Sequence, residues 1–129
     1  MKKFDELYAI ATRKSQYDQT NTWFKGVETY LEAIGKEVDE VREEIREDRL
    51  CHLEDELGDV LWNYLNVLKA LEREKGIDPE KVLERACNKY DQRVSAIESG
   101  RSWDDVKQQQ KQALNAEHKA AQLEDVKSQ

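Results

Sequence analysis

Apolar side chains recur at alternating steps of four and three residues between positions 27 and 45 of the chain. They are Val27, Leu31, Ile34, Val38, Val41 and Ile45. This spacing is typical of an amphipathic helix that packs along one face. A second apolar run of helical period covers residues 51–75, and a short polar turn lies between the two runs. The pattern predicts helices over 23–47 and 51–75 that form an antiparallel hairpin.

Local signals predict two further helices. One covers residues 3–16, and another begins at Pro79, because proline favours the first helical position. Gly76 ends the helix before Pro79. The N-cap candidates for the 23–47 helix are Thr20, Asn21 and Thr22. We expect an all-α bundle of four to five helices in a domain of residues 1–112. Residues 113–129 are polar and predict either a solvated helix or a disordered tail.

Composition limits the classes of partner. The chain has 129 residues, 38% of them charged, and a net charge of −7. An acidic surface argues against nucleic acid or an anionic membrane as partner, and no apolar run approaches a membrane span, so we expect a cytoplasmic protein. One small hairpin buries little apolar area, which predicts a homodimer or homotetramer. Cys51 and Cys87 fit no disulfide or zinc pattern and are expected to be reduced and structural.

Polar side chains form a stripe along each helix of the predicted hairpin. On a helical wheel, the stripe of the 51–75 helix covers about 80° and consists of Glu56, Asp59, Asn63 and Asn66. The stripe of the 23–47 helix consists of Glu37, Glu40 and Glu44. Both stripes are displaced to the same side of the apolar seams. In an antiparallel hairpin they therefore meet.

Register brings four carboxylates to one level of the hairpin. Counting from a turn centred near residue 48 sets Glu37 opposite Asp59, and Glu40 opposite Glu56. Close like charges are costly without a cation, and Mg²⁺ prefers such oxygen ligands. Gly35 and Gly58 flank these positions, which suggests a close approach to the cluster. The alternative is two solvated acidic faces. A ferritin-like diiron site is disfavoured, since neither histidine follows a glutamate by three residues.

These residues resemble a known family. Glu37-x-x-Glu40, followed after fifteen residues by Glu56-Leu57-Gly58-Asp59, is similar to the signature of the MazG-like nucleoside triphosphate pyrophosphohydrolases, members of the all-α NTP pyrophosphatase superfamily. Lys89-x-x-x-Arg93 and Trp103-x-x-x-Lys107 resemble its downstream basic pair and closing segment. The resemblance covers roughly residues 24–112. The chain departs from the family at Lys36, where a second glutamate is common, and in a short segment between Arg93 and Trp103.

The resemblance implies hydrolysis of an NTP or dNTP to the monophosphate and pyrophosphate, by water attack at the α-phosphorus, and a role in removing non-standard nucleotides. It implies one or two Mg²⁺ ions, replaceable by Mn²⁺, and residue roles follow. The metal ligands, any of which could instead act as general base, are Glu37, Glu40, Glu56 and Asp59. The phosphate-binding residues are Lys89, Arg93 and Lys107. The nucleoside-binding candidates are Asn63, Asn66, Trp23 and Trp62.

Two other functions fit the same sequence. A pyrophosphatase that acts on phosphoribosyl-ATP or a dinucleotide would share the metal site and differ in its sugar and base contacts. A non-catalytic helical interaction protein would use the apolar seams for a partner and leave the carboxylates to solvent. The sequence does not specify the base or the sugar of the substrate.

Overall fold

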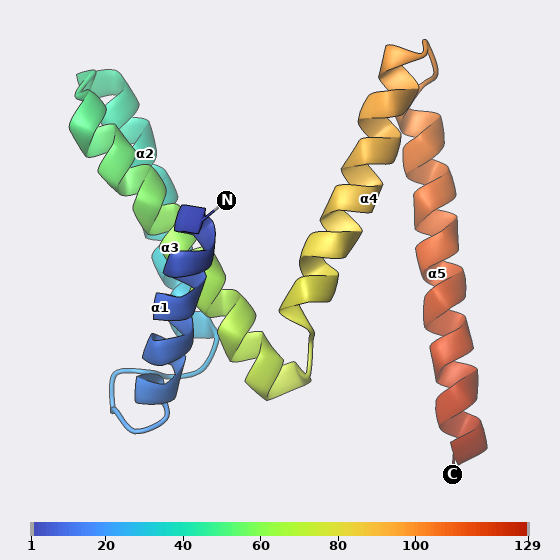
Figure 1. Ribbon diagram of the computed structural model, residues 1–129, viewed down its shortest axis with the longest axis horizontal. Helices are drawn as coiled ribbons and strands as arrows, with labels where there is room; N and C mark the ends of the chain where they lie inside the picture. The colour runs from blue at the N-terminus through green and yellow to red at the C-terminus, as the bar shows by residue number, and fades with distance from the viewer. Residues whose placement is uncertain (1, 129) are drawn as a thin grey trace. The chain divides into compact units, whose positions relative to one another are not determined.

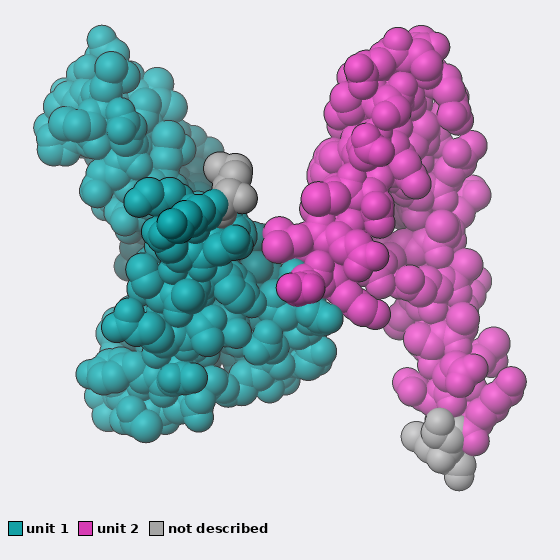
Figure 2. Space-filling view, viewed as in Figure 1, with its two compact units in different colours: residues 1–79 teal, residues 80–129 magenta. Residues whose placement is uncertain are grey.

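The computed structural model describes residues 2–128, which form five α-helices joined by turns (Figure 1). The helices are α1 (Lys2–Asp18), α2 (Glu28–Glu47), α3 (Leu50–Lys75), α4 (Pro79–Glu98) and α5 (Trp103–Ser128). No strand is present in this described part of the chain, so the expected all-α class is confirmed. The chain divides into two compact units, residues 1–79 and residues 80–129 (Figure 2).

The α2–α3 hairpin is the centre of the first unit, as the apolar periodicity predicts. Asp48 closes the turn in the left-handed conformation, with φ 55°, and its N–H donates to the carbonyl oxygen of Glu44 at 3.0 Å. Arg49 adds a two-pronged ion pair to the Glu44 carboxylate, with its Nε at 2.9 Å from Oε2. The turn therefore satisfies groups that the end of α2 would otherwise leave without partners.

Helix α1 packs against α3. Ala11 on α1 and Leu65 on α3 are fully buried. Arg73 Nη1 donates to the carbonyl oxygen of Ser15 at 3.1 Å, and Lys69 Nζ lies 5.3 Å from the Tyr8 ring centroid. These contacts fix α1 across one face of α3.

The start of the second helix differs from the prediction. Helix α2 begins at Glu28 rather than near residue 23, and Val27 occupies its N-cap without a side-chain hydrogen bond. The Asn21 side chain instead accepts hydrogen bonds from the backbone N–H groups of Trp23 and Phe24, each at 2.9 Å. Asn21 thus stabilises a turn of the α1–α2 loop, so its expected role as a helix cap is wrong.

The second unit is an antiparallel hairpin of α4 and α5. Side chains bridge the two helices at matching levels. Arg85 Nη2 lies 2.6 Å from Glu117 Oε2, and Arg93 Nε lies 2.8 Å from Gln110 Oε1.

Gly76 ends α3 at φ 72°, as expected of a glycine C-cap. Residues 113–128, expected as either a solvated helix or a tail, belong to α5.

Several seam positions stay exposed in the single chain. Leu31, Ile45 and Leu57 expose 43%, 59% and 52% of their surface, so the hairpin does not cover its own apolar faces. Cys51 and Cys87 are free, and both are exposed, which excludes the expected structural role in a core. None of the described helices combines the length and apolarity that crossing a membrane requires.

Candidate functional site

Three carboxylates of the α2–α3 hairpin converge. Glu37 on α2 and Glu56 and Asp59 on α3 each present an oxygen atom, and these atoms lie within 4.8 Å of one another. Glu56 and Asp59 are three residues apart and share one face of α3, while the antiparallel arrangement brings Glu37 to their level. We call Glu37, Glu56 and Asp59 the carboxylate cluster.

The other two glutamates of the α2 stripe lie outside this cluster. Glu40 is exposed, yet it is near enough that its charge raises the pKa values of Glu37 and Asp59. Glu44 is buried and its carboxylate is bound by Arg49, so it supports the turn. The cluster itself therefore has three members, with Glu40 at its edge.

Proton affinity in the cluster is unusually high. Hydrogen bonding with Glu37, then with Glu40, together with burial, raises the pKa of Glu56 to about 8. Burial is the largest cause of the raised pKa of Asp59. The hydrogen bond with Glu56 lowers the pKa of Glu37, but burial and the charges of Glu40 and Asp59 outweigh it and raise that pKa overall. A cation bound at the cluster would compete with protons for these carboxylates.

Two oxygen atoms of the cluster have no partner in the part of the chain that the structure describes. Glu37 Oε2 and Glu56 Oε2 are both buried, and neither has a hydrogen-bond partner among the described residues. Buried carboxylate oxygens are normally paired or bound to metal. Hard anionic oxygens from three side chains fit Mg²⁺ or Mn²⁺, which take oxygen ligands and keep several waters. The donor set thus fits a divalent cation.

Close packing does not explain the glycines beside the cluster. A Cβ atom placed on Gly35 or Gly58 would meet no atom within 4 Å. The prediction that close packing against the cluster requires these glycines is therefore wrong for the single chain.

Both stripe asparagines are buried on α3. Asn63 Nδ2 donates to the carbonyl oxygen of Asp59, and Asn66 Nδ2 donates to that of Trp62, each at 2.9 Å. Asn66 is only 1% exposed, and its Oδ1 has no partner in the described part of the chain. Asn63 lies one helical turn from Asp59. The side-chain amide nitrogen of both asparagines is thus hydrogen-bonded to the backbone of their own helix.

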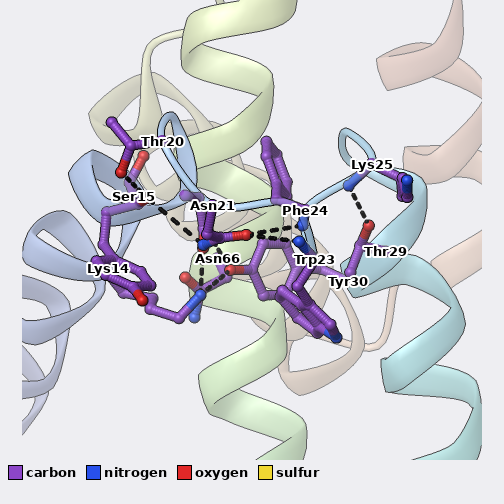
Figure 3. A network of polar contacts seen from close by, with 12 residues as sticks. Lys14, Ser15, Thr20, Asn21, Trp23, Phe24, Lys25, Thr29, Tyr30 and Asn66 are labelled. Atoms are coloured by element: carbon purple, nitrogen blue, oxygen red, sulfur yellow. Dashed lines mark hydrogen bonds and ion pairs between the residues drawn. The ribbon is translucent and has the colours of Figure 1, made fainter.

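A polar network holds Trp23 at the surface of the α1–α2 loop (Figure 3). Lys14 Nζ lies 4.8 Å from the Trp23 ring centroid and 3.1 Å from Tyr30 Oη. Asp18, which is buried, accepts hydrogen bonds from both Lys14 and Tyr30. Burial and the bond to Asp18 raise the pKa of Tyr30. The network leaves Trp23 57% exposed, whereas Trp62 is half-buried on α3.

Trp23 borders a hollow on the flank of α2. The hollow has a volume of about 410 Å³, and its lining includes Thr29, Ala33 and Lys36. Lys36 directly precedes Glu37 in α2. An exposed aromatic ring and a cation therefore adjoin the helix that carries one side of the carboxylate cluster.

The three predicted phosphate-binding residues share a groove in the second unit. The groove has a volume of about 580 Å³ between α4 and α5, and Lys89, Arg93 and Lys107 all line it. Arg93 is 7% exposed and its guanidinium lies against two neighbouring rings, 5.4 Å from the Tyr90 centroid and 5.2 Å from the Trp103 centroid. Its position beside Asp91 and Glu98 in sequence does not lead to an ion pair with either.

One residue that organises this groove was not predicted. Gln110 accepts from Arg93 Nε and donates through Nε2 to the carbonyl oxygen of Lys89 at 3.0 Å and to Gln92 at 2.9 Å. It belongs to a glutamine-rich run that looks like low-complexity sequence. Its spacing from Val106, which is buried, and from Trp103 places it on the inner face of α5, and that spacing was the available signal.

The fold and the cluster define an all-α protein with a candidate divalent-metal centre on a helical hairpin. The family model for the MazG nucleotide pyrophosphohydrolase domain matches residues 25–97, a range that contains α2, α3 and nearly all of α4. The chain therefore belongs to the MazG nucleotide pyrophosphohydrolase family. No curated protein and no solved structure matches it significantly.

Proposed function

We propose that this protein is a Mg²⁺-dependent nucleoside triphosphate pyrophosphohydrolase, which converts an NTP or dNTP to the monophosphate and pyrophosphate. The observation that carries the proposal is the carboxylate cluster, in which Glu37 Oε2 and Glu56 Oε2 are buried without a hydrogen-bond partner among the described residues. Family membership supports the reaction class.

In this proposal Glu37, Glu56 and Asp59 hold the metal, and Glu40 completes the ligand set at the edge of the cluster. The cation supplies charge neutralisation at the phosphates and a lowered pKa for water. A carboxylate oxygen that is not a ligand accepts the proton of the attacking water. The water oxygen forms a bond to the α-phosphorus, the bond from that phosphorus to its bridging oxygen breaks, and pyrophosphate leaves with the electron pair.

The remaining site residues bind the two ends of the substrate. Lys89, Arg93 and Lys107 bind the β- and γ-phosphates, supported by their common groove. Trp23 stacks on the base, supported by its exposed and fixed ring. Asn63, Asn66 and Trp62 contribute the other contacts to the nucleoside.

We further propose that the enzyme acts in the cytoplasm as a homodimer or homotetramer and removes non-standard nucleotides from the pool. The exposed seam residues support the assembly, because Leu31, Ile45 and Leu57 offer apolar surface that a second copy would cover.

Two measurements test the function. The protein is incubated with Mg²⁺ and a panel of ribo- and deoxyribonucleotides, phosphoribosyl-ATP and a dinucleotide, and pyrophosphate and monophosphate are quantified. Thermal unfolding is followed with and without Mg²⁺. We expect pyrophosphate release from at least one triphosphate and a Mg²⁺-dependent rise in Tm that Asp59→Asn removes. Indifference of Tm to Mg²⁺, with no product from any compound, would support a non-catalytic interaction protein.

A further inference from the structure

The groove between α4 and α5 has more positive charge than its protein contacts balance. Its cationic lining residues are Arg85, Lys89, Arg93, Lys107 and Lys111. Its acidic lining residue is Glu117, which is paired with Arg85 at 2.6 Å. Lys89, Lys107 and Lys111 form no ion pair with any described residue. The groove is therefore a concentrated positive patch in a chain whose net charge is −7.

Arg93 is the centre of this patch and has an incomplete set of partners. The residue is 7% exposed, and a guanidinium so far removed from water normally faces a carboxylate. Among the described residues, Arg93 instead contacts two aromatic rings and donates one hydrogen bond, from Nε to Gln110. Its terminal nitrogens remain available to an anion in the groove, in the bidentate geometry that suits phosphate.

Gln110 fixes the direction of that guanidinium. Its oxygen atom accepts from Arg93 Nε, while its nitrogen atom donates to α4 at the carbonyl oxygen of Lys89 and to Gln92. The side chain amide is therefore held on both sides and cannot rotate freely. The neighbouring rings of Tyr90 and Trp103 also contact the Arg93 guanidinium. The site is organised before any ligand arrives, which lowers the cost of binding.

The spacing of the cations that have no carboxylate partner indicates the length of the ligand. Lys89 and Arg93 are one turn apart on α4, and Lys107 and Lys111 are one turn apart on α5. Four residues correspond to a rise of about 6 Å along a helix. Each of the two helices that line the groove therefore carries cations at two levels. A single orthophosphate would engage one level. A chain of two or more linked phosphates would engage both.

We propose that Gln110 is a positioning residue that directs Arg93 toward phosphate in the α4–α5 groove, and that this arrangement lets the groove bind a linear oligophosphate without a metal ion. The ligand is either free inorganic pyrophosphate or the same chemical group at the end of a triphosphate substrate. The proposal deepens the proposed function, since it rests on phosphate binding by Lys89, Arg93 and Lys107 and adds Gln110 and Lys111.

Titration calorimetry of the full chain in EDTA tests the proposal, with orthophosphate, pyrophosphate and tripolyphosphate as probes. We expect pyrophosphate and tripolyphosphate to bind and orthophosphate to bind at least about tenfold more weakly, because it reaches one level of cations. Gln110→Ala should weaken pyrophosphate binding about tenfold. Gln108→Ala is the matched control, because Gln108 is an exposed neighbour in the same glutamine run, and it should bind as the wild type does.

Three results would overturn the proposal. They are no pyrophosphate binding in EDTA, orthophosphate binding as tight as pyrophosphate binding, and equal losses in Gln108→Ala and Gln110→Ala. If Gln110→Ala lowers helix content by circular dichroism, Lys111→Ala provides the second test, since this exposed side chain can be removed without loss of a packing contact. Unchanged pyrophosphate affinity in a folded Lys111→Ala variant would also count against the site.

The same samples separate this proposal from the proposed function. Pyrophosphate binding in EDTA without any nucleotide hydrolysis in Mg²⁺ would support the phosphate site in the groove and contradict the proposed enzymatic function. Mg²⁺-dependent hydrolysis without binding in EDTA would do the reverse. Inhibition by pyrophosphate identifies the source of the ligand. If added pyrophosphate raises the KM for the triphosphate and leaves kcat unchanged, the groove binds the phosphate end of the substrate. If the KM is unchanged, the groove binds free oligophosphate.

Discussion

The raised pKa of Glu56 makes the folding stability of the metal-free protein depend on pH. A carboxyl group that titrates near 8 when folded and near its ordinary value when unfolded favours the folded state most at low pH. That contribution is complete below the unfolded pKa and is lost as pH rises through the folded pKa. Protein stability thus reports on the state of the cluster.

We predict that the Tm of the metal-free protein falls between pH 5 and pH 8, and that Mg²⁺ restores it at pH 8. Deprotonation of Glu56 at the higher pH leaves like charges in contact, and the cation removes that repulsion. Differential scanning fluorimetry across this range, in EDTA and in Mg²⁺, measures both effects. Glu56→Gln should flatten the profile in EDTA. A profile as steep as that of the wild type would mean that another group titrates.

Asp59→Asn should lower kcat by about 10²–10³-fold, the usual cost of removing one group that stabilises the transition state. The helices should stay folded, and the metal-free variant should be more stable than the wild type at pH 8, because one charge is absent. Pyrophosphate release and thermal unfolding give the two values. The matched control is Glu54→Gln, an exposed acid on the same helix. Similar losses in both variants would remove Asp59 from the site.

Arg93→Lys should raise KM for a triphosphate about tenfold while keeping the charge. Lysine cannot retain both the bond to Gln110 and a bidentate grip on phosphate. Steady-state kinetics on a triphosphate and on the matching diphosphate measure the effect. A distal-phosphate contact predicts a greater loss on the triphosphate. Equal losses on both would assign Arg93 to support of the α4–α5 hairpin.

At the level of helices, the sequence predicts elements with a regular period well and irregular connections poorly. The α3 bounds, the Gly76 C-cap and the start of α4 at Pro79 follow from local signals. The start of α2 does not, because Asn21 can cap either a helix or a turn and only tertiary contacts decide.

In the candidate site, too, some features follow from the sequence pattern and others depend on tertiary packing. The juxtaposition of Glu37 with Asp59 follows from helix period and hairpin register, since both are properties of the chain alone. The burial of Arg93 against two rings and the role of Gln110 depend on how α4 meets α5. Residue spacing could place Gln110 on the same face of α5 as Val106, but it could not identify the partners of Gln110 or Arg93.

Asp48→Gly should raise the free energy of unfolding by about 0.5 kcal/mol. Asp48 has φ 55°, and glycine adopts this left-handed conformation without the Cβ penalty, although the more flexible unfolded chain offsets part of the gain. Urea unfolding measures the change. Glu43→Gly, inside α2, is the control and should destabilise by about 0.5–1 kcal/mol. A loss of stability in Asp48→Gly would show that the aspartate side chain stabilises the turn.

For the whole molecule, the exposed apolar surface of the hairpin predicts assembly. Light scattering at micromolar concentration should give a dimer or a tetramer, because Leu57 and its neighbours along the seam are uncovered in one chain. Leu57→Lys should shift the mass toward the monomer. Ile10→Lys, at a 45% exposed position on α1, should not. A wild-type monomer would contradict the proposed assembly.

The exposure of the second half of α5 determines how quickly its amide hydrogens exchange with solvent. Every described side chain from Lys111 to Lys127 is exposed, so this stretch shares little buried surface with the rest of its unit. Helical segments with few buried contacts open locally without global unfolding. In deuterated buffer, peptides from the end of α5 should therefore label far sooner than peptides around Leu65, and a protease should shorten the chain from this end first.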